Sequence, residues 1–398
     1  MQGRNSRVKS NGKYIFNLES PETIDITNNI KLIVVTIEEE FKKFYRLPWV
    51  VYKDDKNWVA PFWIELKDFF KRKNPFWTHA ETKLFIAYKE DIAVGRIAAF
   101  VDRKFCETYQ EKVGFFGFFE CINDFKVASA LLDSAKDWLK SKGMSLIRGP
   151  INGRVDVGCG FLYEGFGETP YILGTYSPEY YIDLVENYGM KKSRDLLLFY
   201  LDLTNPIPKH LKDAANRCEE LGVKIRKFNR LRANKELKWW VPLMMDTFSA
   251  HWGFIPASEE EVKTRFGVKQ ARWFIDSDLF LVAEIDNEPI GFKWTTPDYN
   301  QIFKEMDGKL GFIEALKFLI NRRKINRARL NFVGIKKEHR GKGIGNCMNY
   351  YTMLEMKKRG YIGAEIGWMD EKNIAILKTN EKTGAKLSKK YRVYEKKI

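Results

Sequence analysis

The chain of 398 residues is long enough for two domains with substantial cores, and its 44% hydrophobic and 15% aromatic content excludes an intrinsically disordered protein. No apolar run approaches the ~18 residues of a transmembrane helix, and residues 1–7 lack an apolar signal-peptide core, so we expect a cytoplasmic protein. The net charge of +16 is compatible with phosphate, acidic or membrane partners; because the basic residues are dispersed and no nucleic-acid-binding motif accompanies them, nucleic acid is not favoured.

The first half of the chain predicts a hairpin, a strand, a helix and a further strand. The hairpin covers residues 84–97, the strand residues 117–121 and the helix residues 127–140; the last strand covers residues 195–202. Between them, residues 149–180 are rich in Gly, Pro and Tyr. Such a segment is either a lid or binding loop, or an elaborated hairpin packed at a domain interface.

The second half repeats this order of elements. A hairpin turns at Asp286-Asn287, and the later elements are a strand, a helix ending near Gly360, a strand, a short helix stopped by Gly384 and a closing strand, over residues 330–335, 347–358, 361–369, 373–383 and 389–395. Self-similarity over so long a period indicates duplication. We therefore predict two domains, residues 1–203 and 204–398.

A glycine-rich turn separates the strand 330–335 from the following helix. It reads R-x-x-G-x-G, with Arg340, Gly343 and Gly345, and it matches neither a Walker loop nor G-x-G-x-x-G. Glycine lets the backbone approach a ligand closely, and the free N–H groups of the first helical turn point toward an anion. The turn therefore predicts a diphosphate site; a tight surface turn is the alternative.

This loop resembles the acyl-CoA loop of the GNAT N-acyltransferase superfamily. Asn373 followed by Glu381-Lys382-Thr383-Gly384 resembles a second GNAT signature, and segments such as Arg46-Leu47-Pro48-Trp49 and Arg148-Gly149-Pro150 resemble a bacterial family of two-domain GNAT proteins over nearly the whole chain. The resemblance implies an α/β (mixed α+β) fold: two tandem GNAT-like domains, each a mixed, mostly antiparallel, splayed sheet flanked by helices.

The resemblance also implies an activity and a site. The expected reaction transfers an acyl group from a CoA thioester, with acetyl-CoA the first choice, to an amine acceptor. Backbone groups of the strand would hold the pantetheine arm and those of the loop the pyrophosphate. The implied cofactor-binding residues are Val333, Gly334, Ile335, Arg340, Gly341, Lys342, Gly343, Ile344, Gly345 and Asn373. No metal is expected, because five scattered cysteines and four histidines form no ligand pattern.

Three alternatives stay open. The chain could acylate a lipid amine from a long-chain acyl-CoA, which brings peripheral membrane contact. It could bind CoA as a sensor without turnover, or use an aminoacyl-tRNA donor, against which the CoA loop argues. The aromatic stretches at residues 115–119 and 239–240 could line an acyl tunnel or a membrane-facing groove, or belong to the core.

Catalytic groups are harder to assign. Glu365 on the strand after the loop is the first candidate for general base, with an ion pair to Lys or Arg as its alternative role; Asp370, Glu371 and Glu120 follow. Many GNAT enzymes place a Tyr general acid seven residues after the motif Asn, but this position is Asn380 here. Tyr391 or Tyr394 could replace it, or could simply pack.

The two halves differ at the loop. The first half has Ile122-Asn123-Asp124-Phe125 there, which contains a carboxylate and no glycine. We therefore predict that the first domain does not bind CoA in the usual way. Two basic clusters, Arg322-Arg323-Lys324 with Arg327 and Arg329, and Lys336-Lys337, flank the strand before the second loop and predict a site for the 3′-phosphate of CoA.

Overall fold

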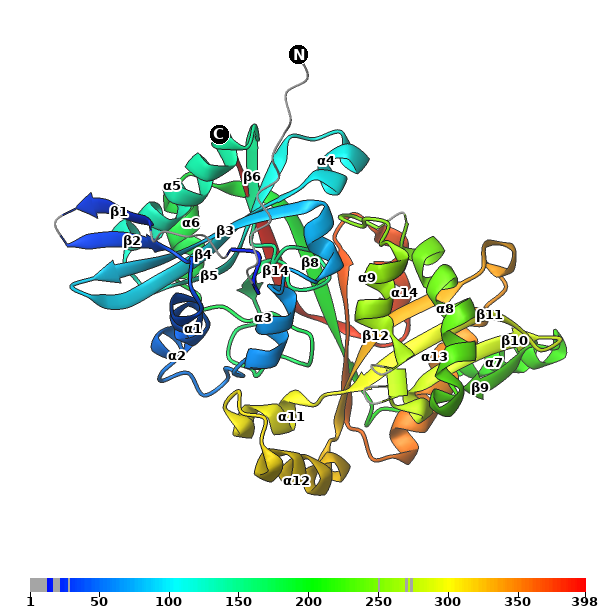
Figure 1. Ribbon diagram of the computed structural model, residues 1–398. Coiled ribbons are helices and arrows are strands. Elements are labelled where there is room, and N and C mark those ends of the chain that lie inside the picture. Colours follow the sequence, from blue (N-terminus) through cyan, green and yellow to red (C-terminus); the bar gives the residue numbers. More distant parts are fainter. Residues whose placement is uncertain (1–12, 17–21, 28, 250, 269–270, 273–274) are drawn as a thin grey trace, which may run out of the picture.

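In the computed structural model, one mixed sheet runs through both halves of the chain (Figure 1). The structure describes residues 13–16, 22–27, 29–249, 251–268, 271–272 and 275–398. Within them the sheet has 14 strands, in the order β1-β2-β3-β4-β5-β6-β14-β8-β13-β12-β11-β10-β9, with β7 also paired to β14. Helices cover both faces, as predicted for tandem GNAT-like domains.

The first half contributes an antiparallel run that ends in one parallel pair. Its strands are β1 (Glu22–Thr27), β2 (Ile30–Val34), β3 (Ala80–Lys89), β4 (Ile92–Asp102), β5 (Val113–Cys121), β6 (Leu146–Gly149), β7 (Phe161–Glu164) and β8 (Lys191–Asp202). Its helices are α1 (Glu38–Arg46), α2 (Pro48–Val51), α3 (Trp63–Phe69), α4 (Arg103–Tyr109), α5 (Phe125–Ser141) and α6 (Tyr181–Asn187), with a 3₁₀ turn η1 (Pro75–Thr78).

The second half has the same plan. Its strands are β9 (Lys224–Lys227), β10 (Phe280–Ile285), β11 (Glu288–Pro297), β12 (Arg327–Ile335), β13 (Gly363–Asp370) and β14 (Lys386–Lys397). Its helices are α7 (Lys209–Glu220), α8 (Ala233–Phe248), α9 (Glu259–Phe266), α11 (Asn300–Phe303), α12 (Phe312–Asn321), α13 (Ile344–Lys358) and α14 (Ile374–Lys382). The predicted hairpins, strands and helices of both halves are thus confirmed, with shifts of a few residues at their ends.

The two hairpins turn in the way that their sequences require. The central residues are Glu90-Asp91 in one and Asp286-Asn287 in the other, and all four have φ between 50° and 65°. Two consecutive positive φ angles match the right-handed twist of the flanking strands, and Asp and Asn tolerate this conformation better than most residues do. The repeated turn chemistry therefore fixes the same register in both copies.

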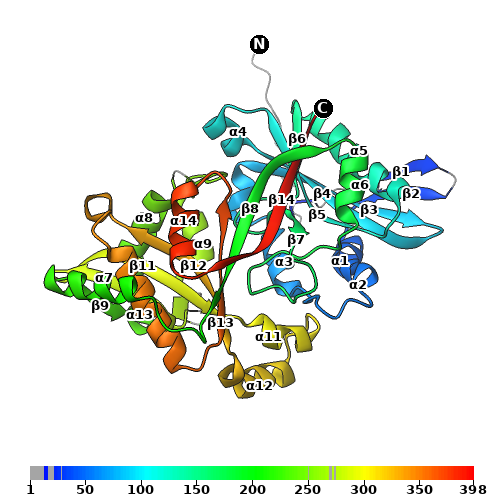
Figure 2. The same cartoon turned by 180° about the vertical axis from the view of Figure 1, so that it is seen from behind.

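The last strand of each half pairs with strands of the other half. β8 lies between β13 and β14, and β14 lies between β8 and β6 (Figure 2). The first half is therefore closed by the C-terminal strand of the chain, and the second half by the strand that ends the first. The division at residue 203 remains a proposal about folding units; the hydrogen-bonded sheet does not stop there.

Each half buries its sheet on both faces. In the first half, α5 and α6 pack on one face, and α1 with the η1 turn packs on the other. In the second half, α8 covers one face, while α7 and α13 cover the opposite one. The aromatic residues singled out in the sequence belong to these cores: Phe115, Phe116 and Trp240 are all almost completely buried.

Candidate functional site

The strands β12 and β13 pair only over their first halves. The parallel register runs from Arg327–Gly363 to Leu330–Ile366 and then ends, although β12 continues beside β11 as far as Ile335. The amide of Lys336 donates to Ile290 of β11. Because strand residues alternate in direction, Val333 and Ile335 turn their N–H and C=O groups away from β11, toward the gap. This is the splayed edge that the sequence predicted at residues 333–335.

The glycine-rich loop lies at the open end of this edge. Gly341 and Gly343 have φ of 78° and 84°, and Gly343 is the N-cap of α13, with no side chain capping the helix. A Cβ on Gly341 would meet no atom within 4 Å, so the backbone conformation, not crowding, demands glycine here. Arg340 donates its Nε–H to the carbonyl of Ile335 at 2.9 Å. The first-turn amides of α13 are thus available to an anion.

In the first half, the equivalent edge is filled by the protein itself. Cys121, which occupies the place of Ile335, donates its N–H to the Tyr181 hydroxyl at 2.9 Å and accepts from the Tyr180 hydroxyl at 2.7 Å. Asn152 accepts the N–H of Phe118 at 2.7 Å. Side chains of the first half therefore occupy these backbone groups, and in the second half Arg340 occupies the carbonyl of Ile335 in the same way.

The helix N-terminus of the first half is filled as well. Asp124 caps α5, because its carboxylate accepts from the amides of Lys126 and Val127 at 2.9 and 3.4 Å. Lys89 adds an ion pair at 2.8 Å. The hydrogen bond from Lys89 lowers the pKa of Asp124 against a smaller opposing effect of burial. A resident carboxylate thus stands where a phosphate would bind.

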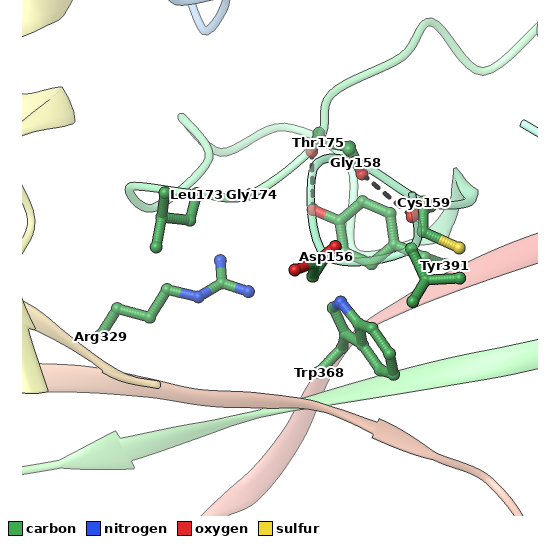
Figure 3. A pocket seen from close by; sticks show the side chains of 10 residues that line it. Asp156, Gly158, Cys159, Leu173, Gly174, Thr175, Arg329, Trp368 and Tyr391 are labelled. Atoms are coloured by element: carbon green, nitrogen blue, oxygen red, sulfur yellow. Dashed lines mark hydrogen bonds between the residues drawn. The ribbon is translucent and has the colours of Figure 1, made fainter. Parts of the chain in front are cut away.

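A small pocket lies where β12 and β13 separate, beneath residues 149–180 (Figure 3). Arg329 of β12, Trp368 of β13 and Tyr391 of β14 form its floor, and Asp156 faces them from the segment above. The remaining lining residues are Val155, Gly158, Cys159, Leu173, Gly174 and Thr175. The pocket therefore combines both halves of the chain.

The segment 149–180 is tied to the second half by several bonds. Arg154 forms an ion pair with Glu261 of α9 at 2.9 Å, and Asp156 forms one with Arg265. The amide of Ile172 donates to Asp298 at 2.9 Å. Of the two roles that the sequence allowed, the interface hairpin is the one seen; the same segment also forms the roof of the pocket.

Comparison with known proteins identifies relatives of this chain and solved structures with a similar fold. No family model matches the chain. It is 31% identical over 382 residues, 94% of its length and 99% of the relative, to the bacterial ceramide synthase of Caulobacter vibrioides. It is also 31% identical over 372 residues, 91% of its length and 94% of the relative, to Protein YghO of Escherichia coli. A tandem GNAT protein from the clavulanic acid biosynthesis pathway superposes with a TM-score of 0.54 at 9% identity, over 92% of this chain and 98% of that one.

The chain belongs to the same family as the bacterial ceramide synthase of Caulobacter vibrioides and Protein YghO, and its fold is that of tandem GNAT proteins. The predicted superfamily and fold are confirmed, and membership supports an acyltransferase role. The acyl-donor site that the GNAT resemblance implied at the splayed edge, the glycine loop and α13 stays a prediction. Within the described residues, no group of three or more potential ligands could hold a metal, and no helix is both long and apolar enough to cross a bilayer.

Among the GNAT catalytic candidates, Glu365 is enclosed by cations. Its side chain is 2% exposed, and its two oxygens accept from Arg329 Nη1 at 3.1 Å and Lys389 Nζ at 3.0 Å. The ion pair that the sequence offered as its alternative role is present. Glu365 does not line the pocket itself, but its partner Arg329 does.

The other acidic candidates have partners of their own. Asp370 binds Arg194 at 2.9 Å, and Glu371 binds Lys192 at 2.6 Å, so both fix β13 to β8. Glu120 accepts from Tyr181 at 2.8 Å, on the filled edge of the first half. Burial raises the pKa of Glu120, although Arg96 and its hydrogen bonds oppose this.

The candidates for general acid are buried. Asn380 of α14 is 8% exposed, and its side-chain amide contacts the sulfur of Met369. Tyr391 donates to the carbonyl of Thr175 at 2.9 Å and Tyr394 donates to Glu186 at 2.8 Å; burial raises the pKa of both phenols. Asn373 is the N-cap of α14, where it accepts from the amide of Ile376 at 3.4 Å.

One sequence expectation is wrong in position. Arg322, Arg323 and Lys324 lie before the start of β12, whereas the loop lies beyond its other end, about 25–30 Å away along nine strand residues. Arg327 and Arg329 bind Asp298 and Glu365 instead. The three residues of this turn therefore lie too far from the loop to contact a pyrophosphate held there, and Lys336 and Lys337 are the basic cluster beside it. Lys337 stays near the loop, paired with Asp246 at 3.2 Å.

The sequence did not predict a role for the pocket residues Asp156 and Trp368. Asp156 comes from the first half and Trp368 from the second, so only the fold brings them together. Lys389, which neutralises Glu365, is 24 residues away from it in the chain. No local spacing signals such contacts; the dense Gly and Tyr content of residues 149–180 was the one usable sign.

Proposed function

We propose that this protein is an N-acyltransferase that moves an acyl group from a CoA thioester to the amine of a long-chain lipid amine. The CoA donor is supported by the loop and the splayed edge. The lipid acceptor is supported by the 31% identity to a bacterial ceramide synthase over 94% of the chain, since a ceramide is an N-acylated long-chain amine. Acetyl-CoA, the first choice from sequence, becomes the second.

The contrast between the halves carries the proposal. In both halves a helix connects the two strands of a splayed parallel pair, but only the first half fills its edge with Tyr180, Tyr181 and Asn152 and its helix N-terminus with Asp124. A buried edge that needed no ligand would be satisfied internally, because unpaired backbone groups are costly. In the second half, Arg340 already donates to the carbonyl of Ile335, whereas the backbone groups of Val333 face the gap, which favours an extended polar ligand there.

On the donor side, the assignments follow from position. The amides from Gly341 to Gly345 would bind the pyrophosphate, with Arg340 and Lys342 adding charge. Val333 and Ile335 would hydrogen-bond the pantetheine arm as an added strand does. The thioester would then lie near the point where β12 and β13 part, so that a strand N–H can stabilise the oxyanion.

On the acceptor side, the pocket beneath residues 149–180 leads to the same point. An amine acceptor arrives as its ammonium, and Asp156, the carboxylate on the pocket wall, is already paired with Arg154 and Arg265, so the ammonium would have to compete with these arginines for it. Attack requires the neutral amine, so one proton must leave before the carbon–nitrogen bond forms and the CoA thiolate departs. Glu365 stays our proposed proton acceptor, and Asn380 the proposed hydrogen-bond donor to the thiolate. Most of the rate enhancement would come from holding the reactants together.

Binding and turnover should be measured separately. Calorimetry with CoA should show saturable binding that Gly343→Val abolishes, because valine cannot adopt a φ of 84° without strain. Gly360→Val is the matched control: Gly360 also has a positive φ, of 79°, but follows the opposite end of α13. If both variants bind CoA like the unaltered protein, the assigned loop is wrong.

Turnover is followed as release of free CoA thiol. Palmitoyl-CoA and acetyl-CoA are each tested against a sphingoid base and a panel of short amines. We expect release to be fastest with palmitoyl-CoA and the sphingoid base. Release with acetyl-CoA and short amines alone would contradict the lipid acceptor. CoA binding with no release on any amine would instead establish a CoA-binding protein without activity.

A further inference from the structure

Helix α12 exposes a row of large apolar side chains to solvent. Phe312 is 85% exposed, Ile313 64% and Ile320 61%. Leu316 and Leu319, which lie between them, are exposed too, as is Leu310 just before the helix. The spacing of three and four residues places Phe312, Leu316, Leu319 and Ile320 along one stripe. A contiguous exposed patch of this kind marks an interaction surface, unlike single exposed apolar residues.

The helix is held to the body by its opposite side. Phe318 stacks on Phe303 at a ring distance of 5.9 Å and contacts Tyr299 at 5.4 Å. The first turn is capped, since Glu314 accepts the amide of Gly311 at 3.1 Å. In both views of the molecule, α12 lies at the outer edge, beside α11 and away from the central strands (Figures 1 and 2). The apolar stripe is thus presented on a formed helix that buries none of its own residues.

Basic residues surround the stripe. Residues 309–324 contain five basic side chains and one acidic one, Glu314. Arg322, Arg323 and Lys324 form the 3₁₀ turn that follows the helix, all exposed, and Lys309 and Lys317 are exposed as well. This is the cluster that lies too far from the loop to serve CoA.

We propose that α12 docks this protein on an anionic lipid bilayer. An apolar stripe with a basic border is what the headgroup boundary of such a membrane accepts: the apolar side chains enter the acyl region and the cations meet lipid phosphates. Ten residues are too few to span a bilayer, so the helix lies in the plane of the interface. A second copy of the chain is a poorer occupant, because it would bring its own basic border and a net charge of +16.

Docking through α12 would place the pocket roof near the membrane. Asn300, at the start of α11, donates to the carbonyl of Pro170 at 2.9 Å, and Asp298 accepts the amide of Ile172 at 2.9 Å. Lys304 reaches Thr169 at 3.0 Å. The element that carries α12 is therefore bonded directly to the segment over the pocket. The docking surface itself does not depend on the proposed function.

Vesicle sedimentation tests the proposal without any substrate. The full chain should sediment with vesicles of phosphatidylglycerol and phosphatidylcholine and stay in solution with phosphatidylcholine alone. Phe312→Ser with Leu316→Ser should weaken binding at least about tenfold, given the apolar area removed. Leu231→Ser, at an 81% exposed leucine outside α12, is the matched control and should bind like the unaltered protein.

Charge variants keep the test independent of helix stability. Arg322→Glu with Arg323→Glu should also release the protein from anionic vesicles, and raising the salt concentration should do the same to the unaltered chain. Thermal unfolding identifies any variant that fails to fold. Equal binding by all variants, or no binding to anionic vesicles, would overturn the proposal. So would a dimer in light scattering that dissociates in Phe312→Ser with Leu316→Ser.

Discussion

Arg329 and Glu365 lie opposite each other on β12 and β13, one pair before the strands separate, and their side chains form a buried ion pair at 3.1 Å. Lys389 from the exchanged strand β14 binds the second carboxylate oxygen at 3.0 Å. One carboxylate thus binds two cations from different strands at the base of the splay. The position that sequence reasoning marked as catalytic also holds the sheet together where its hydrogen bonding stops.

Glu365→Gln should destabilise the protein by about 3 kcal/mol, because it leaves the buried Arg329 without its counter-charge and Lys389 with the exposed Glu168, 3.4 Å away, as its remaining carboxylate partner. The measurement is equilibrium unfolding in urea. Glu371→Gln is the control: that carboxylate pairs with Lys192, which is 40% exposed, and its loss should cost less than about 1 kcal/mol. Should Glu365→Gln keep full stability while CoA-thiol release disappears, the ion pair would be incidental and the role of proton acceptor favoured.

Tyr181→Phe should destabilise the first half without changing the affinity for CoA. The hydroxyl accepts from the buried amide of Cys121 and donates to Glu120 at 2.8 Å, so its removal leaves the amide unsatisfied and takes one hydrogen bond from Glu120, which keeps its ion pair with Arg96, at a cost of about 2 kcal/mol. Urea unfolding gives the stability and calorimetry with CoA gives the affinity. Tyr180→Phe loses a single hydrogen bond, to Cys121, and should cost less. A loss of CoA affinity in Tyr181→Phe at unchanged stability would move the donor site into the first half.

The free energy of unfolding should fall in mild alkali, because His79 loses its proton there. Burial lowers the pKa of His79, but hydrogen bonds to Asp102 at 2.9 Å and to Glu261 at 3.4 Å outweigh it and raise the pKa to about 9. The folded state thus holds the proton more tightly than the unfolded chain, whose His pKa is near 6.5. The stabilisation is full below pH 6.5 and is lost as the pH rises through 9; it amounts to at most about 3 kcal/mol.

The free energy of unfolding between pH 6 and 10 checks this. The unaltered protein should lose stability between pH 6.5 and 9, and His79→Gln should be less stable at pH 6.5 and show a flatter profile. His210→Gln, at an exposed histidine of α7, should follow the unaltered protein. Because burial lowers the pKa of Lys293 to about 8 and so adds an opposite slope, the comparison with His79→Gln decides: parallel profiles of the two proteins would show that His79 is neutral and that its contact with Glu261 does not link the two halves by charge.

The local elements could be read from the sequence, and the reason is physical. The turns at Glu90-Asp91 and Asp286-Asn287, and the glycines at 341 and 343, adopt positive φ angles that only a few residue types tolerate. The sequence also distinguished the two helix N-termini, because one carries Asp124 and the other Gly343. What could not be read were contacts between distant segments, such as Lys389 with Glu365 or Tyr181 with Cys121, which follow from strand order.

Strand order was missed for a similar reason. The closing strand at 389–395 shows its β-propensity and apolar pattern, but nothing in it states which neighbour it will pair with. β14 pairs with β8 and β6, so it serves the first half, and β8 serves the second. Both strands are long and carry Tyr or Phe among charged residues. This pattern suits a strand that lies between the two halves, but it does not specify which strands will be its neighbours.

The exchange of β8 and β14 predicts how the chain can be divided. A fragment 204–398 lacks β8, so the edges of β13 and β14 lose their antiparallel partner over registers that include Ala364–Leu201 and Val393–Arg194. Exposed edges of this kind aggregate. We expect this fragment and fragment 1–203 to precipitate when expressed separately, and to form a complex when refolded together, as measured by gel filtration and circular dichroism.

A cut at residue 190 provides the comparison. Fragment 191–398 keeps β8 covalently beside β13 and β14, so it should remain monomeric and unfold cooperatively where 204–398 does not. It should also retain CoA binding in calorimetry, since the loop, α13 and the splayed edge are all present. If 204–398 alone is monomeric, unfolds cooperatively and binds CoA, then β8 contributes little to the second half, and residue 203 is a folding boundary in spite of the continuous sheet.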